Sequence, residues 1–309
     1  MSNSSDNTIS GNTIKNAGFN GIYFIGDNEK SSVKTSCDNL IYNNDISDTG
    51  LLYGAGSGIS VGIRGASGNK LMNNRIRNTS RYGVNTTYTD FENTIQFNDI
   101  SNCNIGSNDT GMIYGFGSKN IRVIENYLHD SDFKEGGAAI YYDDGCENID
   151  IINNVVESCG GTKQHSVFLI KGSNVRVLNN IAVNNTVTEA VLATNPQFNR
   201  VDNLDVVYNV FYNSGTIVQK HYDFGKTSIG ESGSNLYYDS SEAIAVTAGS
   251  IKSFAEWRNG GYDTDSVITD DVFITAEKRN YKLSDRAIAL GIHDIDIEEI
   301  GLKHYGVEG

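Results

Sequence analysis

The chain has 309 residues, a formal net charge of −14 at pH 7, a single proline and four cysteines. So negative a charge argues against nucleic acid as a partner, and the sequence lacks the apolar run of about 18 residues that marks a membrane-spanning helix. The polar residues that follow Met1 are also unlike a secretory signal peptide. We therefore expect no nucleic-acid partner and no membrane partner.

The cysteines follow no spacing that is typical of a metal site. Cys146 and Cys159 flank one predicted strand and could meet as a pair, but buried free thiols are the expected state of all four: Cys37, Cys103, Cys146 and Cys159. The sequence therefore predicts no metal site and no cofactor.

A short tag recurs along most of the chain: alternating apolar residues, then an Asn, then another apolar residue within two or three positions. Neighbouring tags lie between 24 and 32 residues apart, and a period of this size is typical of solenoids, propellers and arrays. The residues around each tag alternate with period two, as in β-strands, and show no helical period. The tag asparagines are Asn12, Asn44, Asn74, Asn98, Asn126, Asn154, Asn180, Asn209 and Asn235.

Strand-only repeats of variable length predict an all-β fold, a right-handed parallel β-helix that forms a solenoid of about nine coils. One face of each strand points into a narrow interior, so apolar residues alternate with polar ones. The turns between strands need a positive φ angle or a side chain that bonds its own backbone, and Gly and Asn supply these. We expect the tag asparagines to stack as an amide ladder along the axis.

Taken in order, the chain is already in mid-repeat at Asn7, with no helix or cap before it. Because an open solenoid end exposes its core and its strand edges, we expect this end to be covered by a further stretch of chain or by a partner. Residues 1–238 are predicted to form the β-helix, without its N-terminal part. Long Gly-rich loops with aromatic residues are expected at 19–27 and 51–66.

The repeat ends near residue 239, and residues 239–309 are predicted to form a C-terminal extension. Within it, Ser253 and Glu256 form a capping-box pattern that opens a short helix, and Gly260–Gly261 ends that helix. We expect the extension to pack along the side of the coils and to close the C-terminal end of the solenoid.

The central coil, residues 135–154, interrupts the apolar register of the repeat with two adjacent acids, Asp143 and Asp144. The neighbouring coils carry Gly115–Phe116 and Ile170–Lys171 at what we expect to be the same two places. A repeat that departs from its own rule usually does so for a reason.

Three segments resemble the β-helical glycoside hydrolases of the pectin-lyase-like superfamily. Asp109-Thr-Gly-Met-Ile-Tyr114 is similar to their D-G-G-x-I-Y phrase, and Ala139-Ile-Tyr-Tyr-Asp-Asp-Gly145 to their G-I-Y-L-D-[DE]-G phrase one coil later. The extension from Trp257 onward resembles their C-terminal extension, except that Ser284-Asp-Arg-Ala287 stands where the family often has Ser-Pro-Ala. The resemblance runs from Asn98 to the end of the chain and lacks the family's long N-terminal portion. It implies a glycan substrate and an extracellular or periplasmic location.

Glycoside hydrolysis needs two carboxyl groups, one neutral as the acid and one ionised as the base or nucleophile. The candidate acids are Asp109, Glu135 and Asp143, with Asp144 as a turn residue. Glu135 lies one coil from Asp109 and about 8 Å away, a separation that inverting glycosidases use.

The position of Asp143 relative to Asp109 depends on the register of the coils. An alignment of the turn glycines predicts that Asp143 lies over Gly115 and that Asp109 lies over Gly137. Along a straight strand the two acids would then be about 20 Å apart, too far for a glycosidase. They can act together only if the chain turns a corner just after Asp109, which Gly111 permits.

Candidate substrate contacts surround these acids. His165 and Lys171 lie one coil beyond Asp143 and are expected to contact a sugar or to shift the pKa of an acid, and Asp144 is a further candidate contact. The structural alternatives are a solvated surface charge, a turn-capping Asp and an aromatic ladder. The outward tyrosines expected to stack on sugar rings are Tyr23, Tyr88, Tyr114 and Tyr141.

Two other functions remain open. A polysaccharide lyase or epimerase would need a basic cluster or a carboxylate cage for Ca²⁺, whereas the candidate bases Arg64, Arg81, His129 and Lys171 are scattered among the coils. A structural or glycan-binding β-helix, such as a tail-fibre segment, would form trimers and would lack a groove lined by acids.

Overall fold

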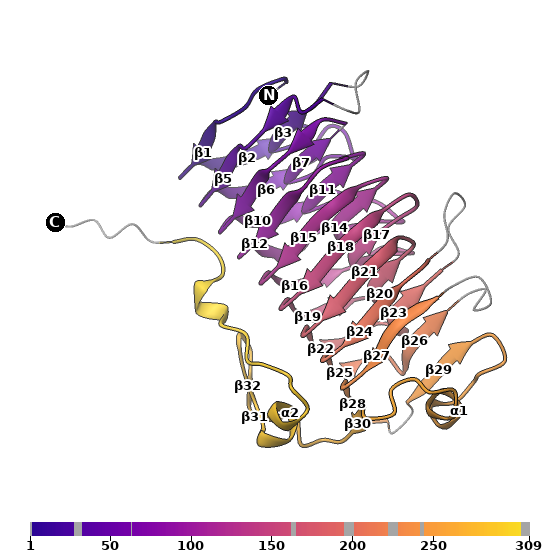
Figure 1. Cartoon of the computed structure of the whole chain (residues 1–309). Coiled ribbons are helices and arrows are strands. Elements are labelled where there is room, and N and C mark those ends of the chain that lie inside the picture. Colours follow the sequence, from indigo (N-terminus) through magenta and orange to yellow (C-terminus); the bar gives the residue numbers. More distant parts are fainter. Residues whose placement is uncertain are drawn as a thin grey trace.

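Each repeat of the sequence folds into one coil, and the coils stack into three long parallel sheets, which we call A, B and C (Figure 1). The computed structural model describes residues 2–27, 33–62, 64–161, 165–194, 201–221, 228–241 and 244–303. Within a coil the chain passes from sheet B to sheet C and then to sheet A. The predicted all-β parallel β-helix is confirmed.

The strands follow each other in chain order within every sheet. Sheet A contains β3 (Ile22–Ile25), β7 (Ile59–Gly62), β11 (Val84–Thr87), β14 (Gly111–Phe116), β17 (Ala138–Tyr142), β20 (Ser166–Ile170), β23 (Glu189–Ala193), β26 (Ile217–His221) and β29 (Ala245–Ala248). Sheet B contains β1 (Thr8–Ser10), β5 (Leu40–Tyr42), β9 (Asn69–Met72), β12 (Asn93–Gln96), β15 (Lys119–Ile124), β18 (Glu147–Ile152), β21 (Ser173–Leu178), β24 (Leu204–Val207) and β27 (Ile229–Gly233). Sheet C contains β2 (Thr13–Ala17), β6 (Asp45–Thr49), β10 (Arg75–Thr79), β13 (Asp99–Ser101), β16 (Tyr127–Asp132), β19 (Val155–Gly160), β22 (Ile181–Asn185), β25 (Val210–Ser214), β28 (Leu236–Tyr238) and β30 (Val267–Ile268).

Smaller elements complete the fold. A short parallel pair joins β4 (Ser36–Cys37) to β8 (Ala66–Ser67), and β31 (Phe273–Glu277) forms an antiparallel hairpin with β32 (Asn280–Leu283). The helical elements are α1 (Phe254–Asn259), α2 (Asp285–Ala289) and the 3₁₀ turn η2 (Ile297–Glu299).

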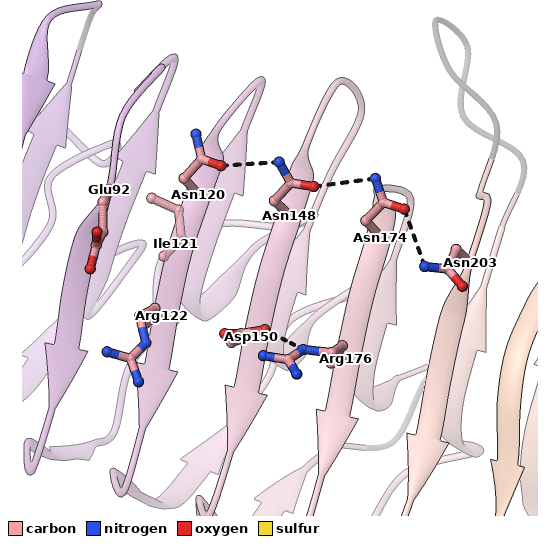
Figure 2. A pocket seen from close by; sticks show the side chains of 9 residues that line it. All are labelled: Glu92, Asn120, Ile121, Arg122, Asn148, Asp150, Asn174, Arg176 and Asn203. Atoms are coloured by element: carbon pink, nitrogen blue, oxygen red, sulfur yellow. Dashed lines mark hydrogen bonds and ion pairs between the residues drawn. The ribbon is translucent and has the colours of Figure 1, made fainter.

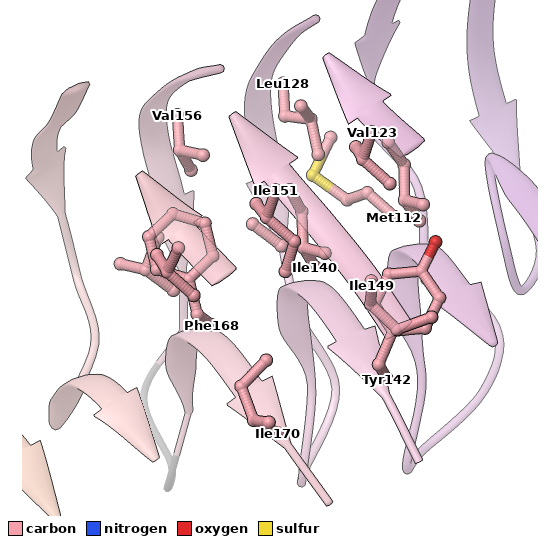
Figure 3. Close-up of a cluster of buried hydrophobic side chains, with 14 of the residues drawn as sticks. Met112, Val123, Leu128, Ile140, Tyr142, Ile149, Ile151, Val156, Phe168 and Ile170 are labelled. Carbon is pink, nitrogen blue, oxygen red and sulfur yellow. The ribbon is translucent and has the colours of Figure 1, made fainter. Parts of the chain in front are cut away.

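The interior is filled by aliphatic and aromatic side chains from all three sheets, because alternate residues of each strand point inward. Ile151 of sheet B, Val156 of sheet C and Phe168 of sheet A come from one coil, and all three are fully buried (Figure 3). The four cysteines are also buried and free, as predicted.

The corner between sheets B and C is a short turn that is the same in successive coils. Its first residue has a positive φ angle, for example Glu125 at 54°. Its second residue is the tag asparagine, whose side chain is buried and bonds the next coil, as when the Asn126 Nδ2 group donates to Asn154 Oδ1 over 3.0 Å. Asn126 Oδ1 in turn accepts from the backbone N–H of Asn98. The predicted amide ladder is confirmed.

The C-terminal extension first closes the end of the solenoid. Helix α1 begins at the predicted capping box, in which the side chains of Ser253 and Glu256 each accept a backbone N–H of the other residue. Phe254 and Trp257 of this helix join the interior cluster. Trp257 Nε1 donates to the buried carboxylate of Asp263 over 2.7 Å. The same carboxylate accepts from the last tag, Asn235, and so terminates the amide ladder.

The extension then runs back along the outer face of sheet C (Figure 1). Apolar side chains of the extension, including Val272 and Leu283, pack on outward residues of sheet C, including Val155 and Ile181. The backbone of Lys303 bonds Asn43 in the second coil. The extension therefore covers the outer face of sheet C where these residues pack. It leaves the outer faces of sheets A and B uncovered.

The boundary proposed after residue 238 stays a prediction, and strand pairing continues beyond it. Strand β29 pairs with β26 and β30 pairs with β28, so residues of the extension still add to sheets A and C. Among the described residues, no helix has the length and apolar character to cross a membrane.

Candidate active site

The corner between sheets C and A differs from coil to coil. Its connections include residues 18–21, 50–58, 102–110 and 133–137, so their lengths vary widely. The loop at 102–110 turns sharply at Asp109, which has a positive φ angle of 50°, and β14 then begins at Gly111. This is the corner that the sequence required just after Asp109.

Asp109 and Glu135 come together at this corner from adjacent coils. The backbone N–H of Asp109 donates to the carbonyl oxygen of Glu135 over 2.9 Å, and both residues are exposed. Both line a depression of about 310 Å³ on the outer side of sheet A. Tyr141, His165 and Lys171 line the same depression.

The floor of the depression is partly apolar. Leu169 and Leu192 follow Tyr141 in one outward row along β17, β20 and β23, and all three contribute to the lining. An apolar floor beside polar groups suits a sugar ring, which has apolar C–H faces and a polar hydroxyl edge.

Asp143 occupies a different position from the one expected. Tyr142, not Asp143, pairs with Gly115, and Gly136, not Gly137, lies beside Asp109. In the following coil Ile170 pairs with Tyr142 and not with Asp143. The expected alignment of Asp143 and Asp144 with Ile170 and Lys171 was therefore also off by one residue. The turn glycines were aligned correctly for sheet B but not for sheet A.

The cause is one additional residue in the corner between sheets A and B. Gly115 pairs with a residue 27 positions later, Tyr142, whereas Lys119 pairs with a residue 28 positions later, Glu147. The turn at Asp143–Gly145 takes up the extra residue, and Gly145 has a positive φ of 76°.

Asp143 forms a partly buried polar cluster with its neighbours. Its Oδ1 atom accepts from Lys171 Nζ over 2.8 Å, and its Oδ2 atom accepts from the Tyr114 hydroxyl over 2.8 Å. The backbone N–H of Asp144 also donates to Asp143 Oδ1, and the carbonyl oxygen of Asp144 accepts from Gly117 N–H. Asp143 does not line the depression, but its partner Lys171 does. Asp144 holds the predicted turn position.

Burial and, after it, nearby charges raise the pKa of the phenols in and beside this cluster. Burial, followed by the charge of Asp143, raises the pKa of Tyr114 and of Tyr141. Burial also raises the pKa of Tyr82 to about 12. The negative charges of Asp109 and Asp143 both raise the pKa of Tyr82 and of Tyr141, so the two carboxylates act on the same pair of hydroxyls.

The four tyrosines expected to stack on sugar rings do not form one continuous strip. Tyr114 and Tyr141 are only 8% and 1% exposed, because Tyr114 stacks on Tyr82 at 4.4 Å and meets Tyr141 edge-on at 5.1 Å. Ser60 and Asn85 separate Tyr23 from Tyr114 in their outward row. Tyr88 lies at the corner beyond β11, where it packs edge-on against Phe116. Only Tyr141 lines the depression.

His165 sits at the side of the depression as a buried, neutral ring. Burial is the main cause of its lowered pKa. Its Nδ1 atom accepts the backbone N–H of Gly137 over 3.3 Å, which leaves the proton on Nε2. The ring also packs edge-on against Phe133. These contacts hold the backbone next to Glu135 in place.

A buried ion pair in the next coils was not predicted. Glu189 is fully buried, and its Oε1 atom accepts from Lys220 Nζ over 2.7 Å. Glu189 pairs in register with Ser166, which lines the depression. The one signal in the sequence is a Glu at the start of an apolar strand, where neighbouring coils carry Ala138 and Ser166.

No group of three or more His, Cys, Asp or Glu side chains is arranged to hold a metal ion within the described ranges.

Comparison with known proteins gives one family. A family model described as a right handed beta helix region matches residues 1–156. No curated protein matches the chain. No solved structure matches it either.

Proposed function

The chain belongs to the right-handed β-helix family, and from this premise we propose that it is a glycoside hydrolase whose site is the depression on sheet A. The observation that carries the proposal is the pairing of Asp109 with Glu135. Two exposed carboxyl groups from adjacent coils line one depression, and glycoside hydrolysis needs a proton donor and an ionised carboxylate on either side of one bond.

The other lining residues fit a supporting role. Leu169 and Leu192 give the floor of the depression a small apolar area against which one face of a sugar ring can lie. Lys171 lines the depression while its ammonium is held by the Asp143 carboxylate, so it is placed to contact a bound sugar. Asp143 and Tyr114 are positioning residues, since Asp143 holds Lys171 by an ion pair and Tyr114 by a hydrogen bond.

The experiment is a reducing-sugar assay over a panel of plant and bacterial glycans. We compare the parent with Asp109→Asn and Glu135→Gln, which remove one carboxyl group each and keep the shape of the side chain. A loss of about 10³-fold in rate, equivalent to about 4 kcal/mol of activation free energy, is expected for each variant. Glu277→Gln, at an exposed position of the β31–β32 hairpin, is the matched control and keeps the parent rate.

Other outcomes separate the alternatives. Parent rates in both variants would remove Asp109 and Glu135 from the mechanism. A calcium-dependent rise in ultraviolet absorbance from an unsaturated sugar would indicate a polysaccharide lyase instead. Binding without turnover across the whole panel would indicate a structural or glycan-binding β-helix.

A further inference from the structure

The outer face of sheet B carries a second depression, of about 360 Å³ (Figure 2), that shares no lining residue with the sheet A site. Two rows of polar side chains follow the axis of the solenoid across it. One row is made of amides at the start of the strands, and the other is made of charged residues two positions further along each strand.

The amide row is a second, exposed asparagine ladder. Asn148 donates to Asn120 over 3.0 Å, Asn174 donates to Asn148 over 3.2 Å, and Asn203 donates to Asn174 over 3.2 Å. All four backbones have φ angles between 53° and 59°, which fixes the same direction for each side chain. A side-chain amide has two N–H donors and two acceptor positions. The ladder uses one of each at Asn148 and Asn174, so the others face outward.

In the second row a cation alternates with a neutral or acidic residue from coil to coil. Strand register places its members in the order Lys70, Thr94, Arg122, Asp150, Arg176 and Asp205. A cation therefore recurs at every second coil. Since neighbouring strands lie about 4.8 Å apart, successive cations are about 9.6 Å apart along the axis.

The arginines of this row keep donors for a ligand. Arg122 is exposed and makes no ion pair with any residue of the described ranges. Arg176 uses its Nε atom for Asp150, over 2.7 Å, and its side chain remains 49% exposed. The guanidinium fork suits a carboxylate, which it can bind through two parallel hydrogen bonds.

We propose that sheet B binds a linear acidic glycan in which a carboxylated sugar alternates with a neutral sugar. An extended glycan advances by roughly one coil per sugar, so its carboxylates would meet Lys70, Arg122 and Arg176 in turn. The neutral sugars lie opposite Thr94 and Asp150, and hydroxyl groups bond the amide row. Asp150 repels a polymer that carries a carboxylate on every sugar, which gives the face its specificity.

The test is isothermal titration calorimetry at an ionic strength of about 0.02 M, where exposed charges are weakly screened. Hyaluronan fragments, in which a carboxylated sugar alternates with a neutral one, are the probe. Polygalacturonate, with a carboxylate on every sugar, and neutral chitin fragments are the comparison ligands. We expect hyaluronan to bind at least tenfold more tightly than either, and its affinity to fall as salt is added.

Variants locate the binding face. The double variant Arg122→Gln/Arg176→Gln is expected to lose at least tenfold in affinity, and Asp150→Asn to gain severalfold. Lys282→Gln/Arg286→Gln removes the same charge from exposed positions of the extension and keeps the parent affinity. Any one of three results would overturn the proposal: no binding of hyaluronan, equal losses of affinity in the two double variants, or equal affinity for polygalacturonate and hyaluronan.

Discussion

Two corners of the same solenoid follow opposite rules. At the corner between sheets B and C every coil makes the same short turn, and every coil after the first buries the same asparagine. At the corner between sheets C and A the connections change length from coil to coil, and two of them present Asp109 and Glu135. The chain therefore keeps its scaffold at one corner and varies the other.

The difference has a physical cause. A buried amide that bonds both neighbouring coils leaves no unsatisfied group only if every coil repeats the turn, so the B–C corner tolerates little change. A connection on the surface has no such partner to satisfy and can lengthen at small cost in free energy. A repeat protein can thus acquire a site at one corner without altering the stacking of its coils.

Removing one amide of the buried ladder is expected to have the largest effect on stability. Asn126→Ala deletes the side-chain bonds to Asn98 and Asn154 and to the carbonyl oxygens of Ile95 and Ile124. Several buried groups then lack partners, which costs about 4 kcal/mol in the free energy of unfolding. Denaturant unfolding followed by circular dichroism measures this. A loss below about 1 kcal/mol would contradict the role of the ladder.

The ion pair behind the depression is expected to have the next largest effect. Lys171→Met leaves the carboxylate of Asp143, whose side chain is 9% exposed, without its cation. Since Lys171 is itself 23% exposed, solvent reduces the cost to about 2 kcal/mol. The double variant Lys171→Met/Asp143→Leu is expected to recover most of this loss. Additive losses in a double-mutant cycle would show that the pair does not couple.

Acid is expected to weaken the C-terminal end of sheet A. The amide ladder between sheets B and C has no group that titrates in this pH range, so its contribution to stability is not expected to change. Burial lowers the pKa of His221 to about 4, below its value in an unfolded chain. The unfolded chain therefore takes up a proton first. The stability contributed by the neutral ring is fully present above about pH 6.5 and declines as the pH falls toward 4, by about 2 kcal/mol at pH 5.

The measurement compares parent and His221→Gln in denaturant unfolding between pH 7 and pH 5. We expect the variant to lose less stability than the parent over this range, because Gln does not titrate. Identical changes in both proteins would show that His221 is not the responsible group.

The smallest expected effect sharpens the comparison of the two ladders. Asn148, like Asn126, bonds the side-chain amides of both neighbouring coils, but it is exposed, whereas Asn126 is buried and also bonds two backbone carbonyl groups. Water replaces the lost bonds in Asn148→Ala, so the expected cost is about 0.5 kcal/mol. Equal losses for Asn148→Ala and Asn126→Ala would mean that burial does not decide the contribution of these amides.

The sequence predicted the regular corner well and the variable corner only in part. The tags located the coils and the ladder, and the spacing of Ser253 and Glu256 located the capping box of α1, because each depends on local rules of spacing. The pairing of Asp109 with Glu135 also followed from coil stacking. The position of Asp143 did not, since one added residue between Tyr142 and Glu147 shifts the register of sheet A and leaves that of sheet B unchanged.

Contacts between distant segments were harder to predict. The tyrosines were expected to point outward, and they do, but Tyr82 and Tyr114 bury each other by stacking across coils. The ion pair of Glu189 with Lys220 joins two strands whose register is set by the intervening loop length, and the spacing of the tags does not specify that length.

The most direct test measures hydrolysis and unfolding on the same set of proteins. We compare the parent with Asp109→Asn, Glu135→Gln and Asn126→Ala, using the glycan that the parent hydrolyses fastest and a thermal unfolding scan. The two carboxyl variants are expected to lose about 10³-fold in rate and to keep the parent unfolding midpoint within about 2 °C. Asn126→Ala is expected to unfold at a clearly lower temperature and to keep the parent rate while folded. Parent rates in both carboxyl variants would contradict the claim that the C–A corner carries the catalytic site while the B–C corner stabilises the solenoid.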